Sequence, residues 1–152
     1  MATNSVVSDE STVQYDPSHR YQKSSIILEE DRMKCVFSAF DTETAVELAW
    51  IEYWGLPNTV LVAVEKQIQV LMDIEHPNIV KYHQAWVDKR QKKAIFITEA
   101  MPSIQKGCIT TVRRFLARGA QMKATVLQKW LLQVLKGLHF LHSMDPPFIH
   151  RD

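Results

Sequence analysis

The segment Ala124 to Asp152 constrains the fold of this chain more than any other, because two prolines separate an amphipathic helix from a short polar motif. Apolar side chains recur there at the i, i+3, i+4 and i+7 spacing of one helical stripe, and Gln and Lys occupy the opposite side. The stripe consists of Leu127, Trp130, Leu131, Val134, Leu138 and Leu141. Since Pro146 and Pro147 cannot continue a helix, we expect a helix with one buried face, followed by an extended segment.

The composition argues against several functional classes. The chain has 152 residues and a formal net charge of +1, which gives no electrostatic reason to bind nucleic acid or an anionic membrane. No apolar run approaches the roughly 20 residues of a membrane span. The two cysteines, Cys35 and Cys108, have neither disulfide-framework nor metal-site spacing. We therefore expect a cytoplasmic protein without a metal site, a nucleic-acid partner or a membrane partner.

Hydrophobic periodicity predicts a mixture of strands and helices along the rest of the chain. The segment 1–20 is rich in Ser, Thr, Asp and Glu and is predicted to be a flexible arm. The predicted strands are 24–28, 34–40, 45–51, 82–87 and 94–98, with a turn at 29–32. A helix is predicted over 60–71 with Asn58 or Thr59 as its N-cap, and a short helix over 111–118 before the long terminal helix.

Several motifs resemble protein kinases. Residues 150–152 read His-Arg-Asp, the tripeptide that opens the kinase catalytic loop, and 75–81 read Glu-His-Pro-Asn-Ile-Val-Lys, as after helix C. Residues 96–101, Phe-Ile-Thr-Glu-Ala-Met, resemble the last N-lobe strand and the hinge. The run 41–50, Asp-Thr-Glu-Thr-Ala-Val-Glu-Leu-Ala-Trp, resembles the with-no-lysine (WNK) serine/threonine kinases. Trp130, Leu135-Lys136-Gly137-Leu138 and Asp145-Pro146-Pro147 agree with that family, while 20–23, 79–83 and 94–99 also resemble the nuclear receptor-binding protein pseudokinase.

The resemblance implies an α+β fold, namely a kinase N-lobe of about five antiparallel strands with helix C, followed by the first helices of the C-lobe. It divides the chain into the arm 1–20, the N-lobe and hinge 21–101, and a truncated start of the C-lobe over 102–152. Because the metal-binding segment and the activation loop would follow Asp152, we expect this polypeptide to be inactive as written. We also expect the terminal helix to expose part of its apolar stripe.

The resemblance further implies ATP and magnesium as cofactors and protein Ser/Thr hydroxyls as substrates. Asp152 would be the catalytic base. Thr98 would be the gatekeeper, and the backbone of Glu99 and Met101 would face adenine. The position of the usual third-strand lysine holds Ile51, and WNK kinases use a second-strand lysine instead, which here is Lys34. The alternative for Lys34 is an ordinary solvated strand lysine.

Two features depart from an active kinase. Residues 29–33, at the position of the loop that cradles phosphates, read Glu-Glu-Asp-Arg-Met, so they contain three carboxylates and no glycine. The helix C position that normally holds a glutamate is Gln67, which cannot neutralise a lysine. These losses keep a second hypothesis open, a pseudokinase scaffold that binds protein partners. Strand alternation predicts one shared direction for Lys34, Val36 and Ser38, and the opposite one for Cys35 and Phe37.

Overall fold

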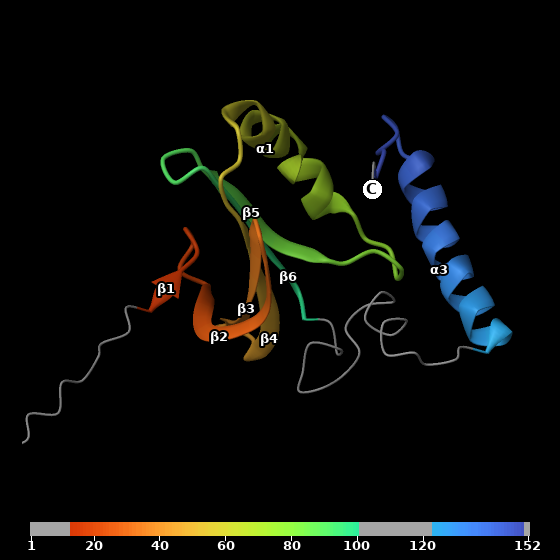
Figure 1. The fold of residues 1–152 in the computed structure, drawn as a ribbon, viewed down its shortest axis with the longest axis horizontal. Coiled ribbons are helices and arrows are strands. Elements are labelled where there is room, and N and C mark those ends of the chain that lie inside the picture. Colours follow the sequence, from red (N-terminus) through yellow and green to blue (C-terminus); the bar gives the residue numbers. More distant parts are fainter. Residues whose placement is uncertain (1–12, 101–122, 151–152) are drawn as a thin grey trace, which may run out of the picture.

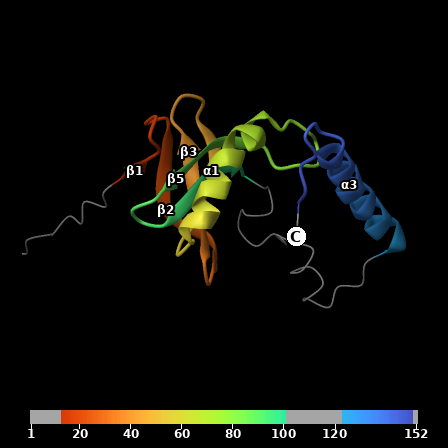
Figure 2. The same ribbon diagram turned by 90° about the horizontal axis from the view of Figure 1, so that it is seen from above.

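The computed structural model describes residues 13–100 and 123–150, which form a curled six-stranded antiparallel sheet and two helices (Figure 1). The strands are β1 (Gln14–Tyr15), β2 (Tyr21–Asp31), β3 (Lys34–Asp41), β4 (Val46–Tyr53), β5 (Tyr82–Asp88) and β6 (Lys93–Glu99), in the order β1-β2-β3-β4-β6-β5. Helix α1 (Asn58–Asp73) lies against the sheet, and α3 (Ala124–His142) stands to one side of both in two perpendicular views (Figures 1 and 2). The predicted α+β class is confirmed, with six strands where about five were expected.

One face of the sheet, which we call the inner face, holds the hydrophobic core. The buried residues of this core are Tyr21, Ala39, Leu48, Trp50, Ile95 and Ile97. Trp50 meets Trp86 edge to face, with ring centroids 5.1 Å apart. Because the sheet curls, Tyr21 of β2 also lies near His83 of β5, with ring centroids 6.4 Å apart. The curl thus brings β2 and β5, which lie far apart in the strand order, together beside the core.

A buried carboxylate, Glu52, ties three strands together on the inner face. Its side chain accepts hydrogen bonds from the Lys23 ammonium at 2.5 Å, from the Lys93 ammonium at 3.1 Å and from Trp50 Nε1 at 2.9 Å. Burial alone would raise the pKa of Glu52, but the two lysines outweigh burial and hold that pKa below its usual value. The Lys23 ammonium also lies 3.7 Å from the centre of the Phe37 ring. The buried charge of Glu52 is thus paired with two lysines.

Helix α1 begins at Asn58, one residue earlier than it would if Asn58 were its N-cap. The predicted caps, Asn58 and Thr59, are wrong, because Pro57 is the N-cap and no side chain caps the helix. The Pro57 carbonyl accepts the N–H groups of Val60 and Leu61, both at 3.0 Å. As the N-cap, Pro57 lies outside the helical region with a ψ of 148°, while its ring restricts φ, which is −59°. This start directs Leu61 into the interior, where it is fully buried.

The structure corrects the predicted turn at 29–32. Strand β2 continues through Asp31, which pairs with Lys34, so the turn consists of Arg32 and Met33 alone. The register of β2 and β3 shifts between Lys23 and Ile27 and again before Glu29, which bends the hairpin. The acidic residues 29–31 thus lie on β2, where successive side chains point to opposite faces of the sheet.

Part of the segment predicted as a flexible arm belongs to the sheet. Gln14 pairs with Lys23 as the start of β1, and residues 1–12 lie outside the described residues. Asp16 is buried and accepts the N–H groups of Tyr21 at 2.7 Å and Ser18 at 2.9 Å. This carboxylate supplies the partners that make an ordered turn possible in a polar segment. The helix predicted at 111–118 also lies outside the described residues.

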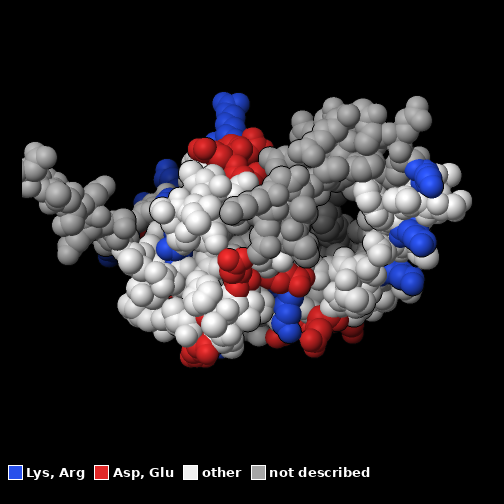
Figure 3. Space-filling view, turned by 90° about the horizontal axis from the view of Figure 1, so that it is seen from below, with Lys and Arg blue, Asp and Glu red and all other residues white. Residues whose placement is uncertain are grey.

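Helix α3 packs through a glycine against the linker between α1 and β5. A Cβ atom on Gly137 would lie 3.2 Å from the Asn78 carbonyl oxygen, so only glycine allows this close approach without adjustment. On the helix surface, Leu127 is 44% and Val134 is 57% exposed, as the sequence predicts. In Figure 3, Lys and Arg side chains line the outer side of the part of the molecule where Figure 1 places α3. The helix therefore has a solvated polar side beside a partly uncovered apolar stripe.

Candidate functional site

The register of the sheet aligns three rows of side chains on the face that α1 covers. Residues directly opposite each other in antiparallel strands point to the same face. From β3 through β4 to β6, the rows are Ser38, Ala49 and Thr98, then Val36, Ile51 and Phe96, and then Lys34, Tyr53 and Ala94. We call this surface the α1 face. The prediction that Lys34, Val36 and Ser38 share one direction is confirmed.

The end of the α1 face nearest the hinge sequence is apolar and closely packed. Val36, Ala49 and Thr98 are 3%, 2% and 3% exposed. The Thr98 hydroxyl donates to the Glu99 carbonyl oxygen at 3.2 Å, and the Glu99 N–H donates to the Lys81 carbonyl oxygen at 3.0 Å. These side chains have the apolar character that a planar heterocycle such as adenine requires, but they are already buried. Met101, the other predicted adenine contact, lies outside the described residues.

The position of the usual kinase lysine is occupied by an apolar side chain, Ile51, which lines a cavity under α1. This cavity, about 310 Å³ in volume, lies between Ile51, Tyr53 and Phe96 of the sheet and Val60, Val64 and Leu71 of the helix. The Phe96 ring meets Tyr53 at 6.0 Å and Tyr82 at 5.9 Å between centroids. The site of a lysine and carboxylate pair in other kinases is thus hydrophobic here.

Helix α1 offers no carboxylate to this cavity. Gln67, the residue predicted at the glutamate position, is exposed and is not among the residues that line the cavity. Glu65 is exposed as well and pairs with Lys89 in the β5–β6 turn at 2.8 Å. A lysine placed at position 51 would therefore find no ready counter-ion on the helix.

Lys34 lies one row beyond Ile51 toward the end of the β2–β3 hairpin. Its cross-strand partners are Asp31 on β2 and Tyr53 on β4, and its side chain is half-buried. Within residues 13–100 and 123–150, no ion pair to Lys34 is present. The register thus brings the predicted phosphate-binding lysine onto the same face as the predicted adenine contacts, while Gln67 is not brought to it.

The hairpin end itself differs from a phosphate-cradling loop. Its two-residue turn, Arg32 and Met33, has no glycine, and neither residue has a positive φ. The Asp31 carboxylate accepts the Arg32 N–H at 2.7 Å. The position of Asp31 opposite Lys34 could not be read from the sequence while 29–32 was taken as a turn. The turn reads Arg-Met and has no Asn-Gly or similar dipeptide, so the usual sequence signal of a tight hairpin is absent there.

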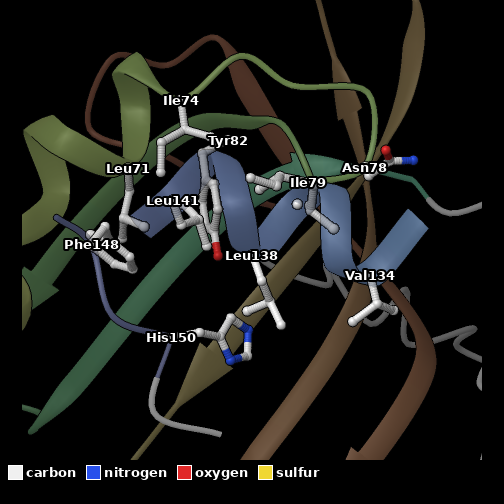
Figure 4. Close-up of a pocket in the computed structure, with 12 residues that line it drawn as sticks. Leu71, Ile74, Asn78, Ile79, Tyr82, Val134, Leu138, Leu141, Phe148 and His150 are labelled. Carbon is white, nitrogen blue, oxygen red and sulfur yellow. The ribbon is translucent and has the colours of Figure 1, made fainter. Parts of the chain in front are cut away.

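A second cavity, of about 370 Å³, lies between α1, the following linker, α3 and the C-terminal segment (Figure 4). Ile79, Leu138, Leu141 and Phe148 line it, and Leu71 and Tyr82 line this cavity as well as the one under α1. Burial raises the pKa of the Tyr82 hydroxyl. His150, next to the predicted catalytic motif, borders the cavity, whereas Asp152 lies outside the described residues.

The residues present fit only part of the nucleotide that a kinase uses. Val36 and Ala49 are apolar, as an adenine site requires, but are only 3% and 2% exposed, and the backbone groups of Glu99 already bond Lys81 and Thr98. At the phosphate end, Ile51 is uncharged and Asp31 shares the face of Lys34. Among the described residues, no three His, Cys, Asp or Glu side chains cluster as a metal site would require. Nor does any described helix have the length and apolarity needed to cross a membrane.

Comparison with known proteins identifies the family. The protein kinase domain matches residues 57–152. The chain is 38% identical to human serine/threonine-protein kinase WNK4 over 143 residues, which cover 90% of the chain and 11% of WNK4. It is 39% identical to mouse serine/threonine-protein kinase WNK3 over 143 residues, covering 90% of the chain and 8% of WNK3. Human serine/threonine-protein kinase WNK2 is 38% identical over 140 residues, or 88% of the chain and 6% of WNK2.

The chain thus spans about a tenth or less of the length of these relatives. The match includes the strands and helix that build the α1 face, and the kinase family generally uses ATP and Mg²⁺. The predicted fold, a kinase N-lobe with a following helix, is confirmed by the sheet, α1 and this match. This chain belongs to the protein kinase family and is WNK-like in sequence.

Proposed function

We propose that this chain supplies the nucleotide-binding part of a serine/threonine protein kinase, which transfers a phosphoryl group from ATP to hydroxyl groups of protein substrates. Lys34 is the cation that faces the phosphates, and Asp152 is the base that accepts the substrate proton. Magnesium accompanies ATP in this family and neutralises charge on the phosphates. The names of the relatives, all serine/threonine-protein kinases, support this class of substrate.

In this proposal the adenine ring lies against Val36 and Ala49. Thr98 is the gatekeeper beside it, and the backbone groups of Glu99 and Met101 lie at its edge. A net charge of +1 gives the chain no reason to prefer nucleic acid, so its partners are proteins. A cytoplasmic location and the division into an arm, an N-lobe with hinge, and a C-lobe start after residue 101 belong to the same proposal.

The observation that carries the proposal is the placement of Lys34. It lies on the same face as Val36 and two residues closer to the hairpin end, a separation of about 7 Å along the strand. Because Ile51 has no charge, another cation must face the phosphates, and the shared face of Lys34, Val36 and Ile51 supports Lys34 in this role. Its half-buried position also limits screening by solvent.

A hybrid kinase tests this proposal. Residues 1–152 are joined to the part of human WNK4 that follows its matching His-Arg-Asp sequence, and phosphate transfer from labelled ATP to a serine-containing protein is measured. We expect activity in the hybrid and a loss of at least about 100-fold in Lys34→Met, the size that follows removal of one transition-state donor. Lys66→Met, which removes an exposed lysine from α1, is the matched control and keeps full activity.

Two results would contradict the proposal in different ways. Full activity in Lys34→Met removes this lysine from the site and leaves a solvated strand lysine. No activity in the hybrid, although it folds and its WNK4 part is intact, favours the pseudokinase scaffold instead. An Asp152→Asn hybrid that retains activity would show that the base lies elsewhere.

A further inference from the structure

The acidic end of the β2–β3 hairpin lies on the face where the nucleotide phosphates would lie. We propose that Asp31 is a built-in competitor of those phosphates, so that this site prefers a nucleoside such as adenosine to a nucleoside triphosphate. The inference rests on the proposed function, because it assumes that adenine lies against the α1 face. It adds a specificity-determining residue that opposes Lys34.

The register places two carboxylates on the α1 face of β2. Asp31 is the direct partner of Lys34, and Glu29 is the direct partner of Val36. Direct partners in an antiparallel pair have Cβ atoms about 5 Å apart and point to the same side. A phosphate group that reaches Lys34 therefore meets the Asp31 carboxylate, and a ribose that leaves Val36 passes Glu29.

The Asp31 carboxylate already occupies a bond that a phosphate would need. In a phosphate-cradling loop, backbone N–H groups of the turn point at the phosphate oxygens. Here the N–H of Arg32, in the middle of the turn, donates to Asp31 Oδ1 at 2.7 Å. Both carboxylate and phosphate are anionic acceptors, so a nucleotide phosphate must displace Asp31 to use this donor.

The net charge of the hairpin end also disfavours an anion. Glu29, Glu30 and Asp31 contribute three negative charges, and Arg32 and Lys34 contribute two positive ones, which leaves a net charge of −1. Glu30 pairs with Cys35 and points to the other face, so the α1 face itself has two carboxylates and Lys34. Arg32 and Asp31 are both exposed, so solvent weakens the attraction of the one for a phosphate and the repulsion by the other alike, and the second carboxylate, Glu29, leaves the α1 face net negative.

The opposite end of the same face has no such conflict. Val36, Ala49 and Thr98 are uncharged, so adenine and an uncharged ribose meet no like charge there. Each added phosphate increases the repulsion from Asp31 and Glu29 without adding a partner beyond Lys34. The affinity is therefore expected to fall or stay level from adenosine to AMP to ATP, the reverse of the order for a phosphate-binding loop.

The test uses the 152-residue chain and isothermal titration calorimetry with adenosine, AMP and ATP, each with Mg²⁺ and with a chelator. Asp31→Asn removes the charge and keeps an acceptor for the Arg32 N–H, whereas Asp31→Gly removes both. The matched control is Asp88→Asn, since Asp88 caps the β5–β6 turn by accepting the N–H groups of Arg90 and Gln91. Thermal unfolding of each variant confirms that it is folded.

We expect the unchanged chain to bind adenosine at least as tightly as ATP. Asp31→Asn should tighten ATP binding about tenfold, a gain that shrinks with added salt, and leave adenosine binding unchanged. Asp31→Gly should tighten ATP binding further, because it frees the Arg32 N–H. Asp88→Asn should change neither ligand.

Other outcomes separate this inference from the proposed function. If adenosine binds and Asp31→Asn leaves the ATP affinity as it was, the inference fails while the adenine site stands. The same holds if the unchanged chain binds ATP ten times more tightly than adenosine. If neither ligand binds to any folded variant, the adenine site of the proposed function is wrong and the inference falls with it.

Discussion

The two faces of the sheet differ in the charges that they hold, and two neighbouring residues of β4 show the difference. Glu52 points to the inner face and is buried among Lys23, Lys93 and Trp50, which donate hydrogen bonds to it. Ile51 points to the α1 face, where it replaces the usual kinase lysine and lines an apolar cavity. The inner face therefore has a buried carboxylate paired with two lysines, while the α1 face lacks the third-strand lysine that is usual in protein kinases.

The difference indicates that stability and nucleotide chemistry are carried by separate sets of residues in this lobe. Hydrogen bonds to Glu52 link β2, β4 and β6, so they hold the sheet whether or not a nucleotide binds. Lys34 has no ion pair within the described residues, so its charge is available to a ligand. Substitutions on the inner face should therefore change folding, and those at the hairpin end should change binding.

The largest expected effect on folding is that of Glu52→Gln. Glutamine keeps an acceptor but leaves two lysines without their counter-charge in a largely buried site, so we expect the free energy of unfolding to fall by about 3 kcal/mol. The matched control is Glu65→Gln, which breaks the exposed pair with Lys89 and should change the free energy by less than about 1 kcal/mol. Urea unfolding followed by circular dichroism measures both. Equal losses in the two variants would show that the hydrogen-bonded network around Glu52 stabilises the fold no more than an exposed ion pair does.

The pH dependence of unfolding should show the same network. The folded-state pKa of Glu52 lies below its ordinary value of 4.5, so the unfolded chain takes up this proton first as the pH falls. The stability from Glu52 is therefore complete above about pH 4.5 and is lost as the pH falls below that value toward the folded-state pKa.

Urea unfolding from pH 6 to pH 3 should thus show a smaller loss in Glu52→Gln than in the unchanged chain. Burial lowers the pKa of His83, and Asp41 beside Arg20 also has a lowered pKa, so both groups add their own losses on acidification. These losses are common to the two proteins, and the difference isolates Glu52. Parallel curves would mean that this carboxylate has the same pKa in both states.

A smaller effect is expected from restoring the kinase lysine on the α1 face. Ile51→Lys places an ammonium beside an apolar cavity whose helix offers no carboxylate, so we expect a loss of about 1–2 kcal/mol in the free energy of unfolding. Because Gln67 is exposed and does not line this cavity, Gln67→Glu should recover little of the loss, with a coupling below about 0.5 kcal/mol in a double-mutant cycle. A coupling of about 1 kcal/mol or more would show that position 67 reaches position 51.

Most of the fold was predictable because its signals are local. Helix α1 and strands β3, β5 and β6 follow from apolar periodicity, and the faces of β3 follow from alternation. The acidic residues 29–31 were misassigned to a turn because Glu and Asp have low strand propensity, whereas pairing with β3 decides their structure. Strand β1 was missed because its order depends on the buried Asp16, which contacts Tyr21 of the next strand.

The candidate site was predictable to a lesser degree. The apolar contacts at Val36 and Thr98 and the placement of Lys34 follow from the motif and from strand alternation. The opposition of Asp31 to Lys34 depends on the register of the hairpin, which is set by a two-residue turn rather than by any hydrophobic pattern. The exposure of Gln67 depends on how α1 lies on the sheet, a tertiary feature that helical periodicity alone does not give.

The sharpest comparison of the two faces substitutes two lysines in the same way, and one of these changes, Lys34→Met, has the smallest expected effect on folding. Lys23→Met removes an ammonium that bonds Glu52 and lies over the Phe37 ring, so the free energy of unfolding should fall by about 2 kcal/mol. Lys34→Met removes an ammonium with no ion pair among the described residues, so the change should stay within about 0.5 kcal/mol. In the hybrid kinase, phosphate-transfer activity should respond in the opposite order. Lys34→Met abolishes the activity, whereas the folded fraction of Lys23→Met retains it. A large fall in the free energy of unfolding of Lys34→Met would mean that this lysine stabilises the sheet. That result would contradict the hypothesis that separate sets of residues carry stability and nucleotide binding.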